Sequence, residues 1–553
     1  MTDSAHTAVP ESTLLPAIPA GRTLDQPLSE RAARNPQHIA LVMGPLQLSY
    51  AALDARVTAL ARAWASMGIR RDDRVALMLP NTPTYVLAFF AAIRLGTVVV
   101  NISPGSQGSE LLHILRDSGA VALVTLDLFL PGLYKVLPGS GVRFLFITSV
   151  QGLEKRIPAP AGAPTPLLID DVCAQPAASA AAGPPDPTDA TSPRSCDDLA
   201  VLQYTSGSTG APKGVMLSHR NILASVAQIC TWMQRDESPN AGVMCVIPFF
   251  HVFGLTIGLH VSVAKGYRML LVPRLDALDL MPLVQLLQTH RPMSFPAVPT
   301  LWAALMSHPK VTADLFDSVL VASSGGAALP TWVQDRYRAL TGKQIYEAYG
   351  LSEASGATHC MPFPAGGPAR SIGRPLAALH VRLVDPADPT RDVGPNEVGE
   401  ILLSGAPVTR GYWHNPTLTA AALRDGWLHT GDLARRDGDG FYYIVDRKDD
   451  LIITSAYNVY PSEVEAALAT HPAVADVAVT GRPDRLRGSV VVAHVVLRPG
   501  TEATGEALQN HCRDNLPDYK VPRVILFVDA VPRNAAGKTL RKDLRSPDAD
   551  RSS

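Results

Sequence analysis

The sequence predicts an α/β protein with more than one domain, and three observations support this. The chain has 553 residues, and at about 150 residues per domain this length suggests three to four folding units. Near the amino terminus, apolar strand-like runs alternate with helical patterns, as they do in a parallel sheet covered by helices. The composition also changes twice, in an Ala/Pro-rich stretch at 174–193 and in a charged run near Asp446, and each change indicates a boundary.

The first elements follow from the residue pattern. Residues 74–80 and 98–103 are apolar runs that indicate buried strands, and residues 85–96 between them have a helical pattern that ends at a glycine. A second helical stretch at 109–119 precedes another apolar run at 121–126. Strands and helices in alternation predict a largely parallel sheet with helices on its faces.

The later part of the chain predicts a second, smaller folding unit. Residues 174–193 are rich in alanine, proline and serine, which indicates a surface linker. After the charged run near Asp446, a helical pattern at 461–471 is followed by strand patterns at 474–481 and 489–497. These elements are enough for a small α+β domain.

The composition excludes several classes of protein. The chain has 49 Lys and Arg against 50 Asp and Glu, a formal net charge of −1, which argues against a nucleic-acid-binding surface. Charged residues make up 18% and hydrophobic residues 46%, which excludes disorder over most of the length. The six cysteines are scattered, with no CxxC pair and no His/Cys cluster at zinc spacing, and this favours a reduced cytoplasmic compartment.

No membrane-spanning segment is predicted. The amino terminus carries Asp3 and Glu11 and lacks a basic start followed by an apolar run, so we expect no secretory signal. Residues 238–264 contain no charged side chain, but a proline and two histidines interrupt them. Fewer apolar residues remain in a row than the roughly 20 that a spanning helix needs. We therefore expect a buried strand, a turn and a helix in this segment.

The densest glycine signal is TSGSTGAPKG at 205–214, directly after an apolar strand-like run. The segment offers three glycines, four hydroxyls and one lysine. Glycines let backbone N–H groups converge, hydroxyls donate further hydrogen bonds and the lysine adds positive charge, which together suit a polyphosphate. The segment is not a P-loop, because Pro212 precedes Lys213 and Gly214 follows it, where that motif needs Gly, Lys and then Ser or Thr.

Further motifs follow this loop in a fixed order along the chain. With the loop itself, they are YTSGSTGAPKGV (204–215), PFFHVFG (248–254), SSGGAALP (323–330), YEAYGLSE (346–353), GEILLSG (399–405), GWLHTGDLA (426–434), VDRKDDLI (445–452), YNVYPSEVE (457–465) and PRNAAGKTLRKDL (532–544). In type and order they resemble the signatures of the adenylate-forming superfamily, which includes acyl-CoA synthetases, luciferases and peptide-synthetase adenylation domains. The resemblance extends over residues 25–545, nearly the whole chain.

The resemblance implies a domain organisation and a two-step reaction. A carboxylate attacks the α-phosphate of ATP to give acyl-adenylate and pyrophosphate, and a thiol then displaces AMP. The implied cofactors are ATP, Mg²⁺ and coenzyme A, or a carrier-protein phosphopantetheine in place of coenzyme A. The implied domains are an N-terminal tail at 1–24, an AMP-binding domain of several subdomains with mixed and parallel sheets at 25–445 (including the linker 174–193), a hinge at 446–449 and a small mobile α+β domain at 450–553.

The same resemblance implies the residues that bind ATP and AMP. Glu353 and Thr209 would also hold Mg²⁺, a hard cation that prefers oxygen ligands. Lys538 would bridge the carboxylate and the α-phosphate during adenylation and then leave the site. The full set is Thr205, Ser206, Gly207, Ser208, Thr209, Gly210, Lys213, Gly325, Gly326, Ala327, Glu347, Ala348, Tyr349, Gly350, Ser352, Asp432, Arg447 and Lys538.

Within that set, the resemblance gives three residues distinct tasks. Tyr349 would stack on adenine, Ser352 would reach the α-phosphate, and Asp432 would accept the ribose hydroxyls beside Arg447. Asp449 corresponds to the hinge residue, whose backbone torsions would change between the two half-reactions.

The acid and thiol sites are implied in the same way. His251 would orient the substrate where the acyl pocket meets the thiol tunnel, next to Val252 and Phe253, and Ser455 and Ala456 would lie along the tunnel. Relatives usually have glycine at the position of Ala456. Residues 248–264 contain no acidic side chain, which disfavours an amino-acid substrate because a buried ammonium needs a partner.

The sequence therefore predicts an acid-thiol ligase that is most similar to bacterial medium- and long-chain fatty acyl-CoA synthetases. The alternatives are an aryl-CoA ligase of the coumarate type and an acyl-AMP ligase that loads an acyl carrier protein. A degenerate synthetase that only binds acyl groups or nucleotides is an alternative of a different class. We expect no nucleic-acid partner, and leave open peripheral membrane contact and the choice between monomer and homodimer.

Overall fold

The computed structural model describes residues 15, 17–149, 159–174, 194–205, 211–234, 241–273, 279–454, 457–485, 487–533 and 539–545. The chain forms two compact units. Unit 1 comprises Met1–Gly367, Pro375–His380 and Ser404–Gly426, and unit 2 comprises Pro368–Arg374, Val381–Leu403 and Trp427–Ser553. The expected linker, apart from Ala174, and most of the expected tail lie outside the described residues. The expected division at 446–449 stays a prediction.

Unit 1 contains a seven-stranded sheet in the order β7-β6-β5-β3-β4-β8-β9. Its neighbours are parallel except β9, which runs antiparallel to β8. The helices and strands predicted between residues 74 and 126 are confirmed as β3, α3, β4, α4 and β5. The strands are β3 (Arg74–Met78), β4 (Val98–Asn101), β5 (Ala120–Leu126), β6 (Phe144–Thr148), β7 (Pro166–Leu168), β8 (Leu199–Thr205) and β9 (Lys213–Ser218).

A second sheet, nearly all of it in unit 1, has nine strands in the order β16-β15-β14-β13-β12-β10-β11-β1-β2, with β16 at Arg374–Pro375. The strands from β14 to β1 are parallel, while β15 is antiparallel to β14 and β2 is antiparallel to β1. One face covers a core that includes Phe295, Trp302 and Phe316. The strands are β1 (Ile39–Met43), β2 (Leu46–Ser49), β10 (Gly242–Cys245), β11 (Arg268–Leu271), β12 (Ser294–Ala297), β13 (Val321–Gly325), β14 (Tyr346–Leu351) and β15 (Gly356–Cys360).

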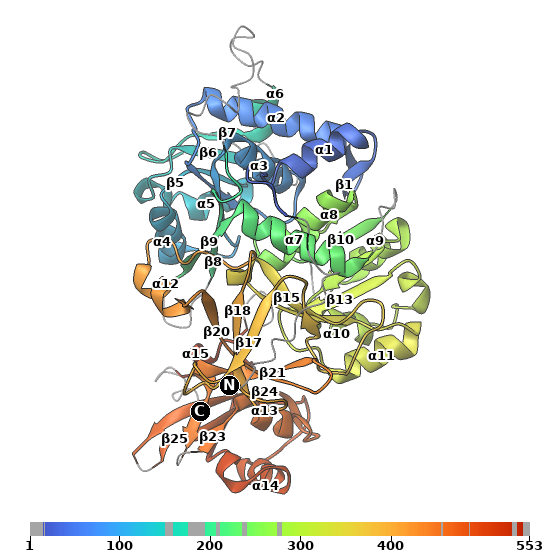
Figure 1. The fold of residues 1–553 in the computed structure, drawn as a ribbon, viewed down its shortest axis with the longest axis vertical. Coiled ribbons are helices and arrows are strands. Elements are labelled where there is room, and N and C mark those ends of the chain that lie inside the picture. Colours follow the sequence, from blue (N-terminus) through green and yellow to red (C-terminus); the bar gives the residue numbers. More distant parts are fainter. Residues whose placement is uncertain are drawn as a thin grey trace, which may run out of the picture. The chain divides into compact units, whose positions relative to one another are not determined.

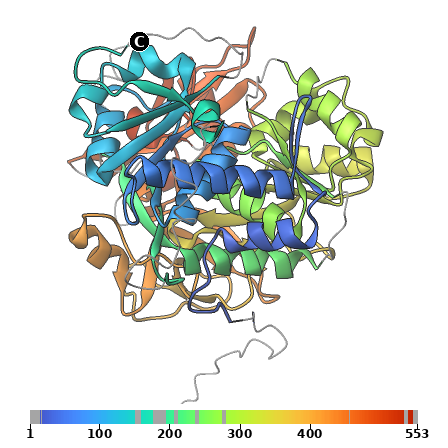
Figure 2. The same ribbon diagram turned by 90° about the horizontal axis from the view of Figure 1, so that it is seen from above.

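Helices cover both sheets of unit 1. In Figures 1 and 2 the blue helices α1 and α2 lie side by side. Helix α2 also packs against α3, which contacts β3 and β4 of the seven-stranded sheet. The helices are α1 (Gln26–Arg34), α2 (Tyr50–Ser66), α3 (Pro83–Leu95), α4 (Gly108–Ser118), α5 (Leu130–Leu133), α6 (Ile169–Ala174), α7 (His219–Met233), α8 (Ser262–Lys265), α9 (Met281–His290), α10 (Pro299–Ser307), α11 (Thr331–Thr341) and α12 (Pro416–Ala422). One short strand, β19 (Leu423–Arg424), follows α12.

The uncharged segment 238–264 confirms the predicted strand, turn and helix. After β10 the chain turns through Pro248 and enters a helix over Gly254–Val261 and α8. The Gly254–Val261 part is a π-helix, η4, which the sequence did not predict. Its leucines at 255 and 259 are fully buried. No helix among the described parts of the chain is long and apolar enough to cross a membrane.

Unit 2 contains two smaller sheets. In the first, β18 pairs antiparallel with β20, which pairs antiparallel with β21. In the second, β22 and β24 flank β25, and β26 runs parallel to β25. The strand and helix predictions at 461–497 are confirmed as α13, β24 and β25. The elements are β17 (His380–Val384), β18 (Gly399–Ser404), β20 (Trp427–Arg436), β21 (Tyr442–Arg447), β22 (Ile452–Thr454), β23 (Tyr457–Val459), β24 (Val474–Asp484), β25 (Gly488–Leu497), β26 (Val524–Phe527), α13 (Pro461–Ala469), α14 (Gly505–Asn515) and α15 (Arg541–Leu544).

Candidate active site

The predicted phosphate loop joins two antiparallel strands of unit 1. Thr205 ends β8 and pairs with Lys213, the first residue of β9. The loop between them therefore leaves the carboxyl end of β8 and returns beside it. Five predicted nucleotide ligands lie in this loop outside the described residues: Ser206, Gly207, Ser208, Thr209 and Gly210.

Helix α4 holds both flanks of this loop. On one side the Tyr204 hydroxyl donates to Asp117 at 2.5 Å, and burial together with this carboxylate raises the pKa of Tyr204. On the other side His113 Nε2 donates to the Pro212 carbonyl at 3.1 Å. Asp117 thus binds a side chain and His113 a backbone carbonyl at the two flanks of the loop, and neither residue was predicted from the sequence.

Gly214 lets the returning strand pack closely. A Cβ atom at this position would lie 3.1 Å from the Tyr204 ring and 3.3 Å from Trp413 Cβ. The Trp413 backbone N–H donates to the Gly214 carbonyl at 2.7 Å, and its indole N–H donates to the Asp117 carbonyl at 2.9 Å. The base of the loop is therefore held by hydrogen bonds and by ring packing around a residue without a side chain.

Glu353, a predicted Mg²⁺ ligand, is bound by Tyr412. The Tyr412 hydroxyl donates to Glu353 Oε1 at 2.8 Å, and the Glu353 carbonyl accepts from the Thr409 N–H at 2.7 Å. Lys213 Nζ lies 6.0 Å from the centre of the Tyr412 ring. Tyr412 therefore contacts residues from two predicted motifs, although sequence reasoning missed it.

The residues around Glu353 fit a magnesium ion. Mg²⁺ is usually held by one or two carboxylates together with phosphate oxygens and water, so a single carboxylate beside a phosphate loop is sufficient protein ligation. Among the described residues there is no group of three or more His, Cys, Asp or Glu placed to hold a metal. When bound, the ion would neutralise phosphate charge.

The motifs at 323–330 and 346–353 meet at the carboxyl ends of β13 and β14. Gly325 pairs with Ala348, Gly326 has a φ of +88°, and Ala327 follows at the exposed end of the strand. The Glu347 carboxylate is buried and accepts from the Leu329 N–H at 3.3 Å. Glu347 thus fixes the small-residue turn by binding its backbone.

The rest of the YEAYGLSE motif is closely packed against β15. Tyr349 pairs with His359, and their rings lie 5.8 Å apart. A Cβ atom at Gly350 would lie 2.1 Å from the Gly356 carbonyl oxygen, so only glycine fits. Ser352 follows in the short turn that carries Glu353. The structure brings these predicted residues to one sheet end, with Tyr349 and Ser352 partly exposed.

Buried polar side chains fix the loop that carries His251. Asn81 donates to the Cys245 and Ile247 carbonyls and accepts from the Phe249 N–H. Gln203, two residues before Thr205, donates to the Phe250 carbonyl at 2.6 Å. Asn81 and Gln203 were not predicted as site residues, because a single polar residue after an apolar run gives no signal of its long-range partner.

His251 is present as a neutral side chain. Burial lowers its pKa, and its Nδ1 accepts from the Phe253 N–H at 3.2 Å, so the ring proton is on Nε2. Val252 is buried, and a Cβ at Gly325 would lie 3.3 Å from the Phe253 ring. Phe253 thus brings the predicted acyl pocket against the predicted nucleotide site.

The predicted ribose-binding pair of unit 2 is formed. Asp432 and Arg447 are register partners on β20 and β21, with Arg447 Nε 3.2 Å from Asp432 Oδ1. Nearby, buried Glu400 accepts from the Gly431 N–H at 3.2 Å and from Lys448 Nζ at 2.9 Å. Asp449 is exposed on the following turn. Ser455, Ala456 and Lys538 lie outside the described residues.

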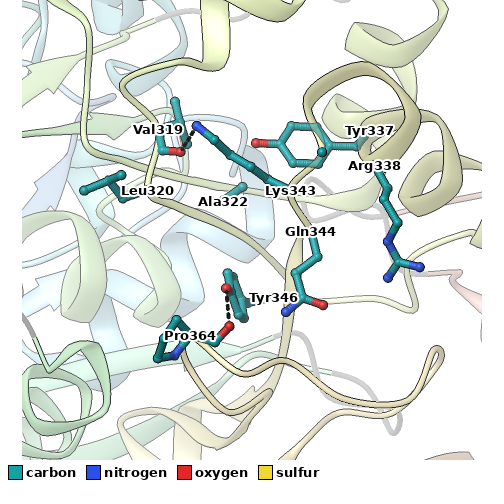
Figure 3. Close-up of a pocket in the computed structure, with 10 residues that line it drawn as sticks. Val319, Leu320, Ala322, Tyr337, Arg338, Lys343, Gln344, Tyr346 and Pro364 are labelled. Carbon is teal, nitrogen blue, oxygen red and sulfur yellow. Dashed lines mark hydrogen bonds between the residues drawn. The ribbon is translucent and has the colours of Figure 1, made fainter.

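One cavity of unit 1 lies away from all these residues. It has a volume of about 340 Å³ and opens at the amino ends of β13 and β14, the opposite end of the strands from Gly325 and Glu353. Figure 3 shows Lys343 on its wall, and Lys343 Nζ donates to the carbonyls of Phe316, Asp317 and Val319. Since the Lys343 ammonium group donates its hydrogen bonds to these three carbonyls, we assign Lys343 a structural role in this cavity.

The comparisons with known proteins agree with this geometry. The profile described as AMP-binding enzyme matches residues 28–413, and that described as AMP-binding enzyme C-terminal domain matches 463–538. A long-chain-fatty-acid–CoA ligase of Bacillus subtilis is 38% identical over 531 residues, 95% of this chain and 94% of the relative. A feruloyl-CoA synthase of Amycolatopsis is 33% identical and covers 93% of this chain and 97% of its own.

Among solved structures, the o-succinylbenzoate coenzyme A synthetase of Bacillus subtilis in complex with ATP and magnesium ion has a TM-score of 0.78 at 28% identity. The alignment covers 94% of this chain and 99% of that one. The likeness therefore includes both the large and the small part of the chain.

Proposed function

Because the chain belongs to the AMP-binding enzyme family and is an AMP-forming acyl-CoA ligase, we propose that it activates a medium- or long-chain fatty acid and transfers it to coenzyme A. The most similar relative reported above acts on long-chain fatty acids by its name. The segment 241–264 supports an apolar acid, since it contains no charged side chain and its leucines and valines are buried.

One observation carries the proposal: Tyr412 joins Glu353 to Lys213. Glu353 follows β14, Lys213 begins β9, and Tyr412 contacts both through its hydroxyl and its ring face. This shared contact with Tyr412 supports a site in which Glu353 serves a cation and Lys213 serves a phosphate. Such a pair suits a metal-bound polyphosphate better than it suits a binding module for acyl groups alone.

The chemistry needs electrostatic help more than proton transfer. At pH 7 a carboxylic acid is already ionised, so its approach to ATP brings two anions together. We assign Lys213 to the β- and γ-phosphates, Glu353 to Mg²⁺ and Lys538 to the attacking carboxylate and the α-phosphate. Asp432 is assigned to the ribose hydroxyls. Neutral His251 orients the acid beside Phe253 and moves no proton in this proposal.

The alternatives are supported less directly. The feruloyl-CoA synthase among the relatives keeps an aryl acid open as a second candidate. Ala456, where relatives usually have glycine, favours testing a carrier-protein phosphopantetheine beside free coenzyme A. The scattered free cysteines support work in a reducing compartment, the cytoplasm.

The test is carboxylate-dependent exchange of labelled pyrophosphate into ATP, across fatty acids of increasing length and across coumaric and ferulic acids. We expect the highest kcat/KM with a medium- or long-chain fatty acid. A preference for the aryl acids would replace the substrate assignment. If a folded protein that binds ATP supported no exchange with any acid, the chain would be a binding module. Thioester assays with coenzyme A and with holo carrier protein then identify the thiol.

A further inference from the structure

The segment that contains Lys538 is closed at its base like a hairpin. Arg533 and Thr539, on either side of residues 534–538, form a β-bridge, and the Leu540 N–H donates to the Pro532 carbonyl at 2.8 Å. Arg533 also holds both oxygens of Asp476, on β24, at 2.8 and 3.0 Å. The first strand of this base is therefore tied to the sheet of unit 2.

The second strand of the base is tied elsewhere, by Arg541. Its guanidinium binds both oxygens of Glu465 at 2.8 and 2.9 Å. The same group lies 3.2 Å from Asp450 and 3.9 Å from Asp446. Only 15% of the Arg541 side chain is exposed, so three carboxylates share one shielded cation.

Arg541 contacts Asp446, the first residue of the expected hinge at 446–449, and Asp450, which directly follows it. The two carboxylate oxygens of Asp446 also accept hydrogen bonds from the backbone N–H groups of Arg447 and Ser462. These bonds fix the Asp446 side chain. Asp450 follows the expected hinge directly and also binds Arg545 at 2.8 Å. Glu465, on α13, accepts from the Val479 N–H and so links the cluster to β24. One guanidinium therefore connects the hinge flanks, α13 and the base of the lysine segment.

Charge explains why an arginine is needed. Burial raises the pKa of Asp446 and of Glu465, and a buried carboxylate without a cation would be costly. One nitrogen of the guanidinium, Nη2, binds both oxygens of Glu465, while the other, Nη1, faces Asp450 and Asp446. The single ammonium group of a lysine lacks this second nitrogen.

We propose that Arg541 is a positioning residue for adenylation: it fixes the base of the Lys538 segment to the hinge flanks, so that a torsion change at the hinge carries Lys538 with it. The inference rests on the role proposed above for Lys538. It assigns Arg541 to the first half-reaction only, because the thiol displaces AMP after the lysine has left.

The experiment measures the two half-reactions separately in the full-length enzyme. Arg541→Lys keeps the charge but loses the second nitrogen that faces Asp450 and Asp446. Arg545→Gln is the matched control, since among the described partners of Arg541 it binds Asp450 alone. Adenylation is followed by pyrophosphate release without coenzyme A, and thioester formation by adding coenzyme A to preformed acyl-AMP. We expect Arg541→Lys to lower the adenylation rate at least tenfold, with thioester formation and the thermal midpoint within the range of Arg545→Gln.

Other outcomes overturn the inference in recognisable ways. Equal losses in both half-reactions, or adenylation within twofold of wild type, would show that Arg541 is only structural. If Arg541→Lys folds poorly, Glu465→Gln weakens the same ion pair from the carboxylate side. This variant should also lose adenylation but keep thioester formation, and an equal loss of both half-reactions would refute the proposal. Lys538→Ala is measured in parallel. If this variant retained adenylation, the role proposed for the lysine would be wrong. If Lys538→Ala lost adenylation while Arg541→Lys kept it, only the inference about Arg541 would be refuted.

Discussion

The segments that carry the phosphate loop and Lys538 are held in different ways. In unit 1 the loop flanks are fixed by hydrogen bonds to Tyr204 and Pro212 and by ring packing at Gly214. In unit 2 the flanks of the lysine segment are fixed by arginines bound to carboxylates, Arg533 to Asp476 and Arg541 to Glu465. The first anchor depends on shape and the second on charge. Substitutions that alter volume should therefore damage the first, and those that alter charge the second.

The largest effect is expected from removing the negative charge of Glu353, the residue of unit 1 assigned to Mg²⁺. Glu353→Gln keeps the shape and the hydrogen bond from Tyr412 but removes the charge for Mg²⁺. We expect the rate of pyrophosphate exchange to fall about 100-fold or more, or about 2.7 kcal/mol in the barrier, with a higher Mg²⁺ requirement. Glu110→Gln, an exposed change in α4, is the control. An unchanged Mg²⁺ titration would remove Glu353 from the metal site.

Lowering the pH should destabilise unit 1 through its buried histidine, His260. Burial lowers the pKa of His260 to about 3, between the rings of Phe89 and Phe90. Because the folded pKa lies below the unfolded one, stability is lost as the pH falls below about 6.5, by about 2 kcal/mol at pH 5 for this group. The buried carboxyls Asp446 and Glu465 in unit 2 have raised pKa values and act in the opposite direction.

This pH dependence can be measured by urea unfolding at pH 7 and pH 5. His260→Leu should lose less stability on acidification than the wild type, and exposed His380→Gln should behave like the wild type. If His260→Leu showed the same loss, the buried imidazole would not be its source.

A volume change tests the anchor of the phosphate loop. Gly214→Ala adds a methyl group 3.1 Å from the Tyr204 ring, so the flank must move. We expect kcat/KM for ATP to fall about tenfold, or about 1.4 kcal/mol. The matched control is Gly132→Ala, where an added Cβ has no neighbour within 4 Å. Equal kinetics in both variants would mean that the packing at Gly214 does not position the loop.

The smallest expected effect comes from a charge change in the shape-dependent anchor. Asp117→Asn keeps a side-chain acceptor for Tyr204, so we expect KM for ATP to rise about threefold, or about 0.6 kcal/mol, with kcat unchanged. A loss as large as that of Arg541→Lys would erase the distinction between the two anchors.

The sequence predicts the regular parts of this molecule well, because local patterns decide them. The strands at 74–78 and 98–101 and helix α13 follow from apolar periodicity, and the ordered motifs single out Gly325, Glu353, Asp432 and Arg447 as candidate site residues. What sequence patterns miss is set by distant contacts. Asn81, Gln203 and Tyr412 look like ordinary polar residues until the sheet brings their partners close. The π-helix at Gly254–Val261 has no local signal of its own.

The central claim is that this chain joins an acid to AMP before any thiol arrives. The most direct test mixes enzyme in excess with ATP, Mg²⁺ and a long-chain fatty acid, without coenzyme A, and measures pyrophosphate and acyl-AMP in one turnover. Our account predicts equal amounts of the two products, and conversion of the bound acyl-AMP to AMP and acyl-CoA when coenzyme A is added. Formation of ADP and phosphate, or no acyl-AMP with any acid that binds, would contradict it.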